Sequence, residues 1–310
     1  MATGVLSAQS LRKVMAEARI WFIETRPKFI VASVVLAFLG TSIAWRDGFF
    51  SLRHAVLAFI GLLLWQIGVQ VLNDYFDYKN GIDLKTHRTP FSGGSGILPA
   101  RLLKPESVLK FGLLSFALAV PIWVYLVIAK GLLLLPIIAV GAVLVLLYTP
   151  VLTRWTVGEI SSGLGIGMLP VLMFYFVQTG GYSAKAAVAA IPSGILLFNV
   201  HLLNELPDVE ADKAGGKRTL PIILGRAKAA WLYLAGTVAV YAWVVAWVTA
   251  GVMPIAALLS LVTMPLALRA IRGALRYRDE AAFTPALWAN ALVLFFTLAL
   301  LASGYIIDGL

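Results

Sequence analysis

Long stretches without a charged residue dominate the sequence, and their lengths suit a lipid bilayer. A transmembrane helix needs about 20 consecutive, mostly apolar residues. Residues 229–268 are about twice that length and contain Gly251 and Pro254, which predict a tight turn between two helices. The pattern predicts nine transmembrane helices from the following stretches free of Asp, Glu, Lys and Arg: 29–45, 54–73, 111–129, 131–153, 160–184, 186–204, 229–268 and 281–307.

The composition supports an all-α, polytopic membrane protein with one domain over residues 1–310. Of the 310 residues, 60% are hydrophobic and 13% are charged, whereas soluble domains carry about 25% charged residues. The absence of cysteine excludes disulfides, thiolate nucleophiles and cysteine metal sites. Residues 1–28 lack the apolar run and cleavage site of a signal peptide, and we expect them to lie at the cytoplasmic membrane surface.

The basic residues predict an orientation in the membrane. If the N-terminus is inside, the inner segments hold 21 of the 25 Lys and Arg residues and the outer segments hold 4. Lys and Arg are concentrated in the cytoplasmic loops of membrane proteins. We therefore expect a cytoplasmic N-terminus and an outer C-terminus, in the cytoplasmic membrane of a bacterium or archaeon. The same bias accounts for the net charge of +10 without a nucleic-acid partner.

A first acidic cluster begins where the second apolar stretch ends, in the inner connection at residues 73–110. It contains Asn73, Asp74, Asp77 and Asp83. Residues three and four apart are neighbours on a helix, so Asn73, Asp74 and Asp77 can share one face. This face would carry one amide and two carboxylates.

A second acidic cluster lies in the inner connection at residues 205–228. Asn204, Asp208 and Asp212 follow one another at steps of four, which predicts one stripe on a helix. Pro207 predicts a kink, or the start of a new helix, just before Asp208. Two similar clusters on the same membrane face favour a common role over two solvated loops.

Carboxylates at the end of an apolar helix favour a site for a divalent cation. Each ionised carboxylate costs about 2.5–3.5 kcal/mol at mid-membrane and less near the interface. Mg²⁺ commonly binds one or two carboxylates together with waters and substrate phosphate oxygens. Two facing pairs of carboxylates therefore suit two Mg²⁺ ions bridged by a diphosphate. The basic residues beside the clusters that could neutralise this diphosphate are Arg26, Lys79, Arg88, Lys217 and Arg218.

Both clusters resemble the motifs of the UbiA-type intramembrane aromatic prenyltransferases. The first family motif, Asn-Asp-x-x-Asp with a further Asp downstream, is similar to Asn73, Asp74, Asp77 and Asp83. The second motif is Asn, then Asp-x-x-x-Asp, then Gly-Lys-x-Thr-Leu. It is similar to Asn204, Asp208, Asp212, Gly216, Lys217, Thr219 and Leu220.

This resemblance implies a nine-helix bundle around a central cavity that is open to lipid and capped by the two inner connections. It implies Mg²⁺-dependent transfer of a prenyl group from a polyprenyl diphosphate to an aromatic acceptor. The implied catalytic metal ligands are Asp74, Asp77, Asp208 and Asp212. The residues implied to contact diphosphate or acceptor are Asn73, Lys79, Asp83, Arg26, Tyr148, Arg154, Asn204, Lys217 and Arg218.

Within this family the spacing of the first motif is similar to that of the menaquinone branch, whose acceptor is 1,4-dihydroxy-2-naphthoate. Asp83 follows Asp77 by six residues, whereas the corresponding distance in the 4-hydroxybenzoate branch is four. Residues 158–159 and 175–180 also resemble the menaquinone branch. Residues 149–154 lack the Gly-Gly-Pro expected there. Alternative acceptors are therefore 4-hydroxybenzoate or another quinone, tetrapyrrole or lipid precursor.

Three further interpretations stay open from the sequence. A cation-coupled secondary transporter is the alternative of another class, although it would place acids near helix midpoints rather than at inner ends. His201 is more typical of a packed histidine than of an acceptor contact. Residues 91–96, Phe-Ser-Gly-Gly-Ser-Gly, could wrap a phosphate with backbone amides or serve as a flexible connector.

Overall fold

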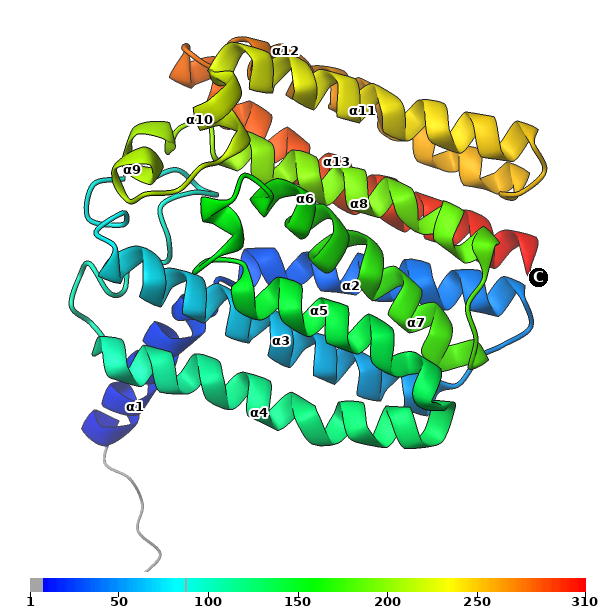
Figure 1. The fold of residues 1–310 in the computed structure, drawn as a ribbon, viewed down its shortest axis with the longest axis horizontal. Helices are drawn as coiled ribbons and strands as arrows, with labels where there is room; N and C mark the ends of the chain where they lie inside the picture. Colours follow the sequence, from blue (N-terminus) through cyan, green and yellow to red (C-terminus); the bar gives the residue numbers. More distant parts are fainter. Residues whose placement is uncertain (1–7, 87) are drawn as a thin grey trace, which may run out of the picture.

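The computed structural model describes residues 8–86 and 88–310, and the secondary structure of this part of the chain is entirely helical. Eight of its helical segments are long and apolar enough to cross a membrane. A shorter apolar segment, Leu132–Leu147, lies among them. The predicted bundle of nine membrane helices is thereby confirmed for the described residues. The axes of these helices lie nearly parallel to one another (Figure 1).

The helices alternate in direction along the chain. The membrane segments are α2 (Pro27–Arg46), α3 (Leu52–Lys79), α4 (Pro105–Lys130), η1 and α5 (Leu132–Leu147), α6, η3 and α7 (Gly158–Thr179), α8 (Ala184–Asn204), α11 (Arg226–Thr249), η4 and α12 (Ile255–Leu275), and α13 (Glu280–Asp308). The remaining helices are α1 (Ala8–Glu24), η2 (Leu152–Arg154), α9 (Val209–Ala214) and α10 (Leu220–Leu224).

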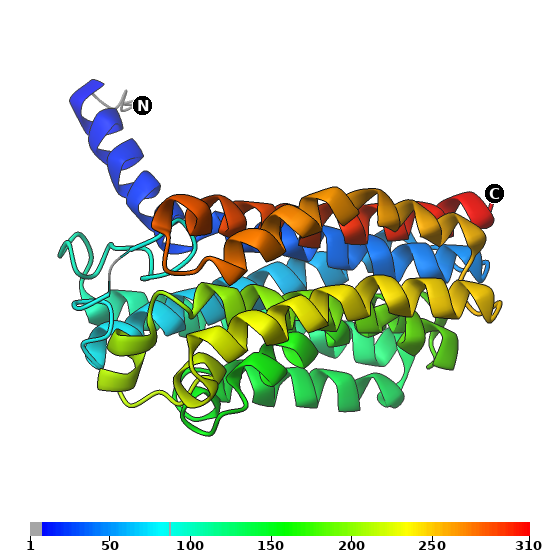
Figure 2. The same cartoon turned by 90° about the horizontal axis from the view of Figure 1, so that it is seen from above.

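Helix boundaries follow the glycine and proline signals of the sequence. α11 ends at Thr249, Gly251 has a left-handed φ of 70°, and the next segment starts after Pro254, so the predicted tight turn is confirmed. α2 begins at Pro27, directly after Arg26, whose left-handed φ of 52° reverses the chain. As a consequence, α1 projects away from the bundle instead of extending α2 (Figure 2).

The outward surface of the bundle is apolar. On α4 the side chains of Leu118, Val124 and Ile128 are 52%, 52% and 79% exposed, and similar residues follow on α5 and α11. An apolar surface of this extent marks contact with other molecules rather than with water. Together with the eight long apolar helices, it defines an integral membrane protein.

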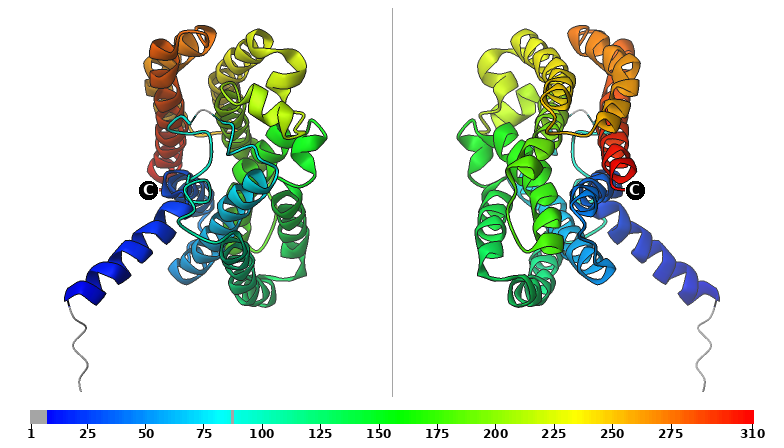
Figure 3. Two further views of the ribbon diagram at one scale, coloured as in Figure 1. Left: turned by 90° about the vertical axis from the view of Figure 1, so that its left-hand side faces the viewer. Right: turned by 90° about the vertical axis from the view of Figure 1, so that its right-hand side faces the viewer.

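The polar connections gather at one end of the bundle. We call this the motif end, defined by residues 80–104 and 205–225, and we call the opposite end, with Asp47 and Asp308, the far end. In the left panel of Figure 3, which looks onto the motif end, the described residues of the connection, 80–86 and 88–104, cross the end of the bundle. α1 lies at the motif end, and the C-terminus lies at the far end (Figure 1).

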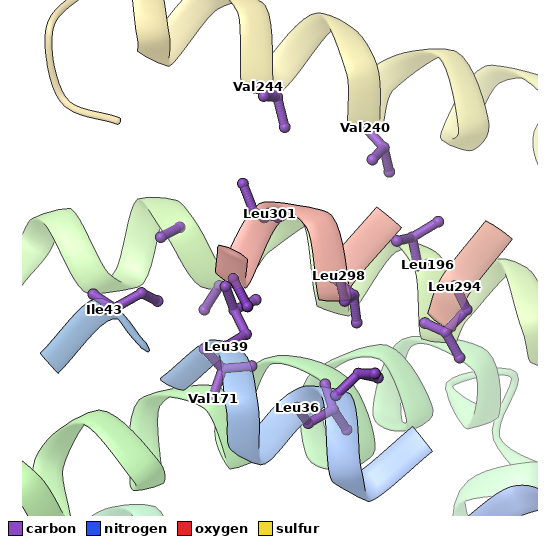
Figure 4. Packing of buried hydrophobic residues seen from close by; sticks show 14 of the residues in the cluster. Leu36, Leu39, Ile43, Val171, Leu196, Val240, Val244, Leu294, Leu298 and Leu301 are labelled. Carbon is purple, nitrogen blue, oxygen red and sulfur yellow. The ribbon is translucent and has the colours of Figure 1, made fainter. Parts of the chain in front are cut away.

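Toward the far end the bundle is closed by dense apolar packing. Leu36, Leu39 and Ile43 of α2 are fully buried against Leu298 and Leu301 of α13 and their neighbours (Figure 4). Polar contacts join the helix ends at the far end of the bundle, beyond this packing. Arg46 Nε lies 2.5 Å from Asp308 Oδ2, and the Tyr175 hydroxyl donates to Asp47 Oδ2 at 2.7 Å.

α1 and the C-terminus lie at opposite ends of the bundle, which allows a direct test of the predicted orientation. An N-terminal fluorescent reporter, which matures only in the cytoplasm, should be bright, and a C-terminal one should be dark. C-terminal alkaline phosphatase, which is active only outside, should show activity, because 21 of the 25 basic residues fall on the proposed inner side. A bright C-terminal fluorescent reporter would contradict this orientation.

Candidate active site

A polar cavity of about 100 Å³ lies at the motif end, between the two acidic clusters. Segments far apart in the sequence meet around it: the end of α3, the connection at 80–104, and the connection between α8 and α11. Both clusters therefore share one cavity, as their common membrane face suggested. The predicted site residues that line it are Arg26, Asn73, Asp77, Asp83, Tyr148, Asn204, Asp208, Asp212 and Lys217.

The last turns of α3 carry the first cluster beyond the apolar part of the helix. α3 has 28 residues, more than the roughly 20 that a bilayer requires, and its acidic residues come at the end. Asn73 Nδ2 donates to Asp77 Oδ2 at 3.2 Å and to Thr149 Oγ1 at 3.1 Å. This amide fixes Asp77 in the wall of the cavity.

The second cluster is divided between two helices. α8 ends at Asn204 and α9 begins at Val209, after a turn that contains Pro207. The predicted single helical stripe is therefore wrong, because the proline ring cannot continue the helix. The alternative of a new helix is confirmed. Asp208 immediately precedes this new helix, and both it and Asp212 line the cavity.

Lys217 joins the two clusters. Its Nζ lies 2.9 Å from Asp77 Oδ2 and 3.1 Å from Asp212 Oδ1. Gly216, with a left-handed φ of 83°, turns the chain so that the Lys217 amide donates to the Asp212 carbonyl at 2.9 Å. Burial alone would lower the pKa of Lys217, but the carboxylates of Asp77 and Asp212 raise it well above its usual range. One buried cation thus holds together two carboxylates that lie 135 residues apart in the sequence.

Asp74 lies behind the cavity wall and is fully engaged. Its Oδ1 lies 3.2 Å from Arg26 Nη1, and its Oδ2 accepts a hydrogen bond from the Ser95 amide at 2.7 Å. The Ser95 hydroxyl in turn donates to Glu24 Oε2 at 2.7 Å. Arg26 also donates to Asn73 Oδ1 at 3.1 Å. In this state Asp74 orders the surrounding loop and presents no free oxygen to the cavity.

The glycine-rich segment at 91–96 forms part of the cavity wall. Phe91, Ser92, Gly93 and Gly94 all line it. Gly94 has a φ of 67°, and a Cβ at this position would lie 2.5 Å from Asp83 Oδ2, so only glycine fits against that carboxylate. The segment is thus built into the site rather than hanging free of it.

The cavity concentrates more negative charge than its own residues neutralise. Burial, followed by the neighbouring Asp77 and Asp74, raises the pKa of Asp83 to about 7. Burial and Asp212 raise the pKa of Asp208 to about 7. Asp77 Oδ1 and Asp208 Oδ1 are buried without a hydrogen-bond partner in the described part of the chain. Such an array favours an additional cation.

The donor set suits Mg²⁺ that binds together with a phosphorylated ligand. Among the described residues, no group of three or more His, Cys, Asp or Glu is arranged as a preformed metal site. Mg²⁺ does not require one, because it commonly combines one or two carboxylates with substrate phosphate oxygens and waters. The unpartnered oxygens of Asp77 and Asp208 fit this mode of binding.

The cavity does not include every residue that the sequence suggested. The side chains of Lys79, Arg154 and Arg218 are exposed and do not line it. Arg218 contributes its backbone instead, because its amide donates to the Thr153 carbonyl at 2.8 Å. The sequence pattern predicts no role for Glu159, which is fully buried and accepts a hydrogen bond from the Leu220 amide. The signal it carried was an acidic residue at the start of an otherwise apolar helix.

An apolar cavity of about 360 Å³ continues from the polar one. It lies between α2, α3, α8 and α13, and its wall includes Val31, Leu197, Leu292 and Phe295. The two cavities share five lining residues: Phe29, Gln70, Phe91, Ile166 and His201. A ligand with a charged head and a long apolar tail matches this pair of cavities.

Comparison with known proteins agrees with this arrangement. The sequence profile of the UbiA prenyltransferase family matches residues 33–296. The chain belongs to the UbiA prenyltransferase family and is a membrane-embedded prenyltransferase. The secondary transporter considered from the sequence is thereby excluded as the class of this protein.

Relatives and solved structures cover most of the chain. It is 32% identical over 256 residues to the 1,4-dihydroxy-2-naphthoate octaprenyltransferase of Bacillus subtilis (strain 168), which covers 80% of both chains. It is 28% identical over 216 residues to the digeranylgeranylglyceryl phosphate synthase of Thermococcus kodakarensis, which covers 68% of this chain and 71% of that one. The structure of a UbiA homolog from Archaeoglobus fulgidus bound to GPP and Mg²⁺ matches with a TM-score of 0.61 and 16% identity, over 91% of this chain and 99% of that one.

Proposed function

We propose that this enzyme transfers a polyprenyl group from a polyprenyl diphosphate to 1,4-dihydroxy-2-naphthoate, with Mg²⁺, in menaquinone biosynthesis. The observation that carries the proposal is the polar cavity in which Lys217 joins Asp77 to Asp212 and which adjoins an apolar cavity. A diphosphate head fits the first cavity and an isoprenoid tail fits the second.

The diphosphate would lie among Arg26, Lys217 and the carboxylates of both motifs. Asp77, Asp208 and Asp212 line the cavity and would hold Mg²⁺. Asp74 would join them when Arg26 turns from its carboxylate to the diphosphate, which frees Asp74 Oδ1. Two Mg²⁺ ions bridged by the diphosphate would account for four carboxylates. When bound, the metal supplies charge neutralisation of the departing diphosphate.

Cleavage of the donor C–O bond and attack by the aromatic ring would both take place at the junction between the two cavities. The C–O bond of the donor would break there, and its electron pair would leave with the diphosphate. Phe29 and Phe91 line both cavities, and their rings already lie beside the cationic side chain of Lys28, so they would also stabilise a neighbouring carbocation. The apolar cavity excludes water, so an electron-rich ring is the nucleophile that reaches the cation. With naphthoate, the ring forms the new C–C bond and loses its carboxylate as CO₂.

Two observations support the naphthoate acceptor over 4-hydroxybenzoate. Asp83 follows Asp77 by six residues, and the Bacillus subtilis relative is named for the naphthoate. We expect membranes containing the protein to convert 1,4-dihydroxy-2-naphthoate and labelled geranyl diphosphate to a prenylated product, identified by mass, only when Mg²⁺ is present. Parallel incubations with 4-hydroxybenzoate should give little product. Efficient turnover of 4-hydroxybenzoate with none of the naphthoate would overturn the assignment.

A further inference from the structure

The junction between the two cavities is lined by three apolar and two polar residues. Of the five residues that line both, Phe29, Phe91 and Ile166 are apolar, so the polar side chains come from Gln70 and His201 alone. If the diphosphate lies in the polar cavity and the isoprenoid in the apolar one, the bond that breaks lies at this junction. The acceptor ring must reach the same point. The inference below therefore rests on the proposed function.

His201 is oriented by its Nδ1 atom. Nδ1 lies 2.5 Å from Ser162 Oγ and 3.2 Å from the carbonyl oxygen of Leu197. A carbonyl oxygen can only accept a hydrogen bond, so the contact with Leu197 requires the tautomer with the proton on Nδ1. The Ser162 hydroxyl oxygen then shares this proton as a second acceptor. The ring also packs edge to face with Tyr148, at 5.9 Å between ring centroids. These contacts fix the orientation of the His201 ring.

The other ring nitrogen of His201 is available. Within the described part of the chain, Nε2 has no hydrogen-bond partner. The atom is not sealed within the protein interior. It is therefore open to the junction that the residue lines. With the proton on Nδ1, this nitrogen carries a lone pair and can only accept a hydrogen bond.

Gln70 is the second polar side chain at the junction and comes from α3. The Gln70 side chain is 8% exposed. Its amide has no hydrogen-bond partner among the described residues, although its atoms are not fully enclosed by protein. A buried amide without a partner is destabilising unless a ligand or water satisfies it. The amide offers two donors and one acceptor, which complement the single acceptor of His201.

We infer that His201 and Gln70 form the subsite that binds a hydroxyl and a further oxygen of the aromatic acceptor. His201 Nε2 accepts a hydrogen bond from a ring hydroxyl, and the Gln70 amide donates to a ring oxygen or carboxylate. The hydrogen bond to Nε2 raises the electron density of the ring that attacks the prenyl carbon. The hydroxyl proton stays on the acceptor, so the bond changes of the reaction are unaltered. His201 and Gln70 orient the ring relative to the breaking C–O bond.

The test compares His201→Phe, His201→Gln and Gln70→Leu in membranes with Mg²⁺, geranyl diphosphate and 1,4-dihydroxy-2-naphthoate. We expect His201→Phe and Gln70→Leu to raise the KM for the naphthoate by about tenfold or more, as for one lost hydrogen bond. The KM for geranyl diphosphate should stay within about twofold in both. His201→Gln, whose amide oxygen can still accept a hydrogen bond, should keep most of the wild-type KM.

Methyl ethers of the acceptor separate the hydrogen bond from a packing effect. The two monomethyl ethers of the naphthoate each lack one hydroxyl donor. For the ether that lacks the hydroxyl bound by His201, wild type and His201→Phe should have the same KM, because the hydrogen bond to Nε2 is already missing. His54→Phe, at the start of α3 near the far end, is the matched control and should behave as wild type.

The outcomes distinguish this inference from the proposed function. If wild type prenylates no hydroxylated aromatic compound, the proposed function fails. If wild type prenylates the naphthoate while His201→Phe and Gln70→Leu leave its KM unchanged, the subsite is wrong. An equal loss for the parent acceptor and for both ethers would assign His201 to packing and would also overturn the subsite. Membrane levels of each variant exclude a loss caused by misfolding.

Discussion

Asp77→Asn and Asp208→Asn should each reduce turnover by about 10²–10³-fold or more, the loss typical of one transition-state contact. The reason is that both carboxylates face the same cavity and both have a buried oxygen without a partner. Because they would act on one metal–diphosphate group, the double variant should be little worse than either single one. Steady-state rates with labelled geranyl diphosphate and the naphthoate measure all three.

Two further measurements belong to this prediction. Higher Mg²⁺ should partly restore the single variants if metal affinity is what they have lost. Their levels in the membrane should hardly change, because neutralising an acid near lipid lowers its burial cost. Glu210→Gln is the matched control, since Glu210 lies on α9 beside Asp208 but is exposed and does not line the cavity. Near-normal turnover of Asp208→Asn, with unchanged Mg²⁺ dependence, would mean that Asp208 does not take part in holding the metal and the diphosphate.

Lys217→Met should destabilise the substrate-free protein and make its stability depend on Mg²⁺. Its side chain is 13% exposed and neutralises Asp77 and Asp212 at 2.9 and 3.1 Å. Removing one partner of a buried ion pair typically costs about 3–5 kcal/mol, because the remaining charge is left buried and unpaired. We therefore expect a lower Tm in detergent, a larger rise in Tm on adding Mg²⁺ than in wild type, and a strong loss of turnover.

Two control variants sharpen this second prediction. Lys217→Arg keeps a cation and should retain most of the Tm, although its planar head group will not reproduce both contacts. Lys213→Met removes an exposed lysine of α9 and should leave Tm, its response to Mg²⁺ and turnover unchanged. If Lys217→Met melts at the wild-type temperature and responds to Mg²⁺ as wild type does, Lys217 is not what neutralises the two clusters.

The helices were predictable because the bilayer imposes a length and a polarity on each of them. The turn at Gly251 and Pro254 needed no tertiary information, since both residues interrupt an apolar run that was too long for one helix. The break before Asp208 was open between a kink and a new helix. A proline permits either, and the packing of the connection decides between them.

The basic residues show where prediction from the sequence stopped. Lys79 and Lys217 both lie beside acidic motifs, yet only Lys217 enters the cavity. Lys79 is two residues from Asp77 on a helix, so the two side chains leave in different directions. Lys217 reaches Asp77 only through the left-handed turn at Gly216 and the packing of distant segments. That contact spans 140 residues and has no local signal.

His201 illustrates the same limit at the junction. On an apolar helix a histidine satisfied by its own backbone and one that faces a cavity have the same sequence context. The Leu197 carbonyl and the Ser162 hydroxyl account for only one of its two nitrogens, and this division becomes visible only when α6 and α8 are placed side by side. Glu24 and Ser95 are similar, because their hydrogen bond joins segments 71 residues apart.

The closed far end has a consequence for the membrane as a barrier. A protein with ionisable groups in a cavity inside a bilayer risks becoming a leak for protons and small ions. Here Leu39, Leu298 and Leu301 lie in a large cluster of buried apolar side chains, and the few hydroxyl groups buried beside it, such as Thr263 and Thr297, bond to one another. Arg46 with Asp308 and Tyr175 with Asp47 tie the helix ends beyond this cluster. The bundle can therefore admit water to its carboxylates from one side while an ion gradient across the membrane is preserved.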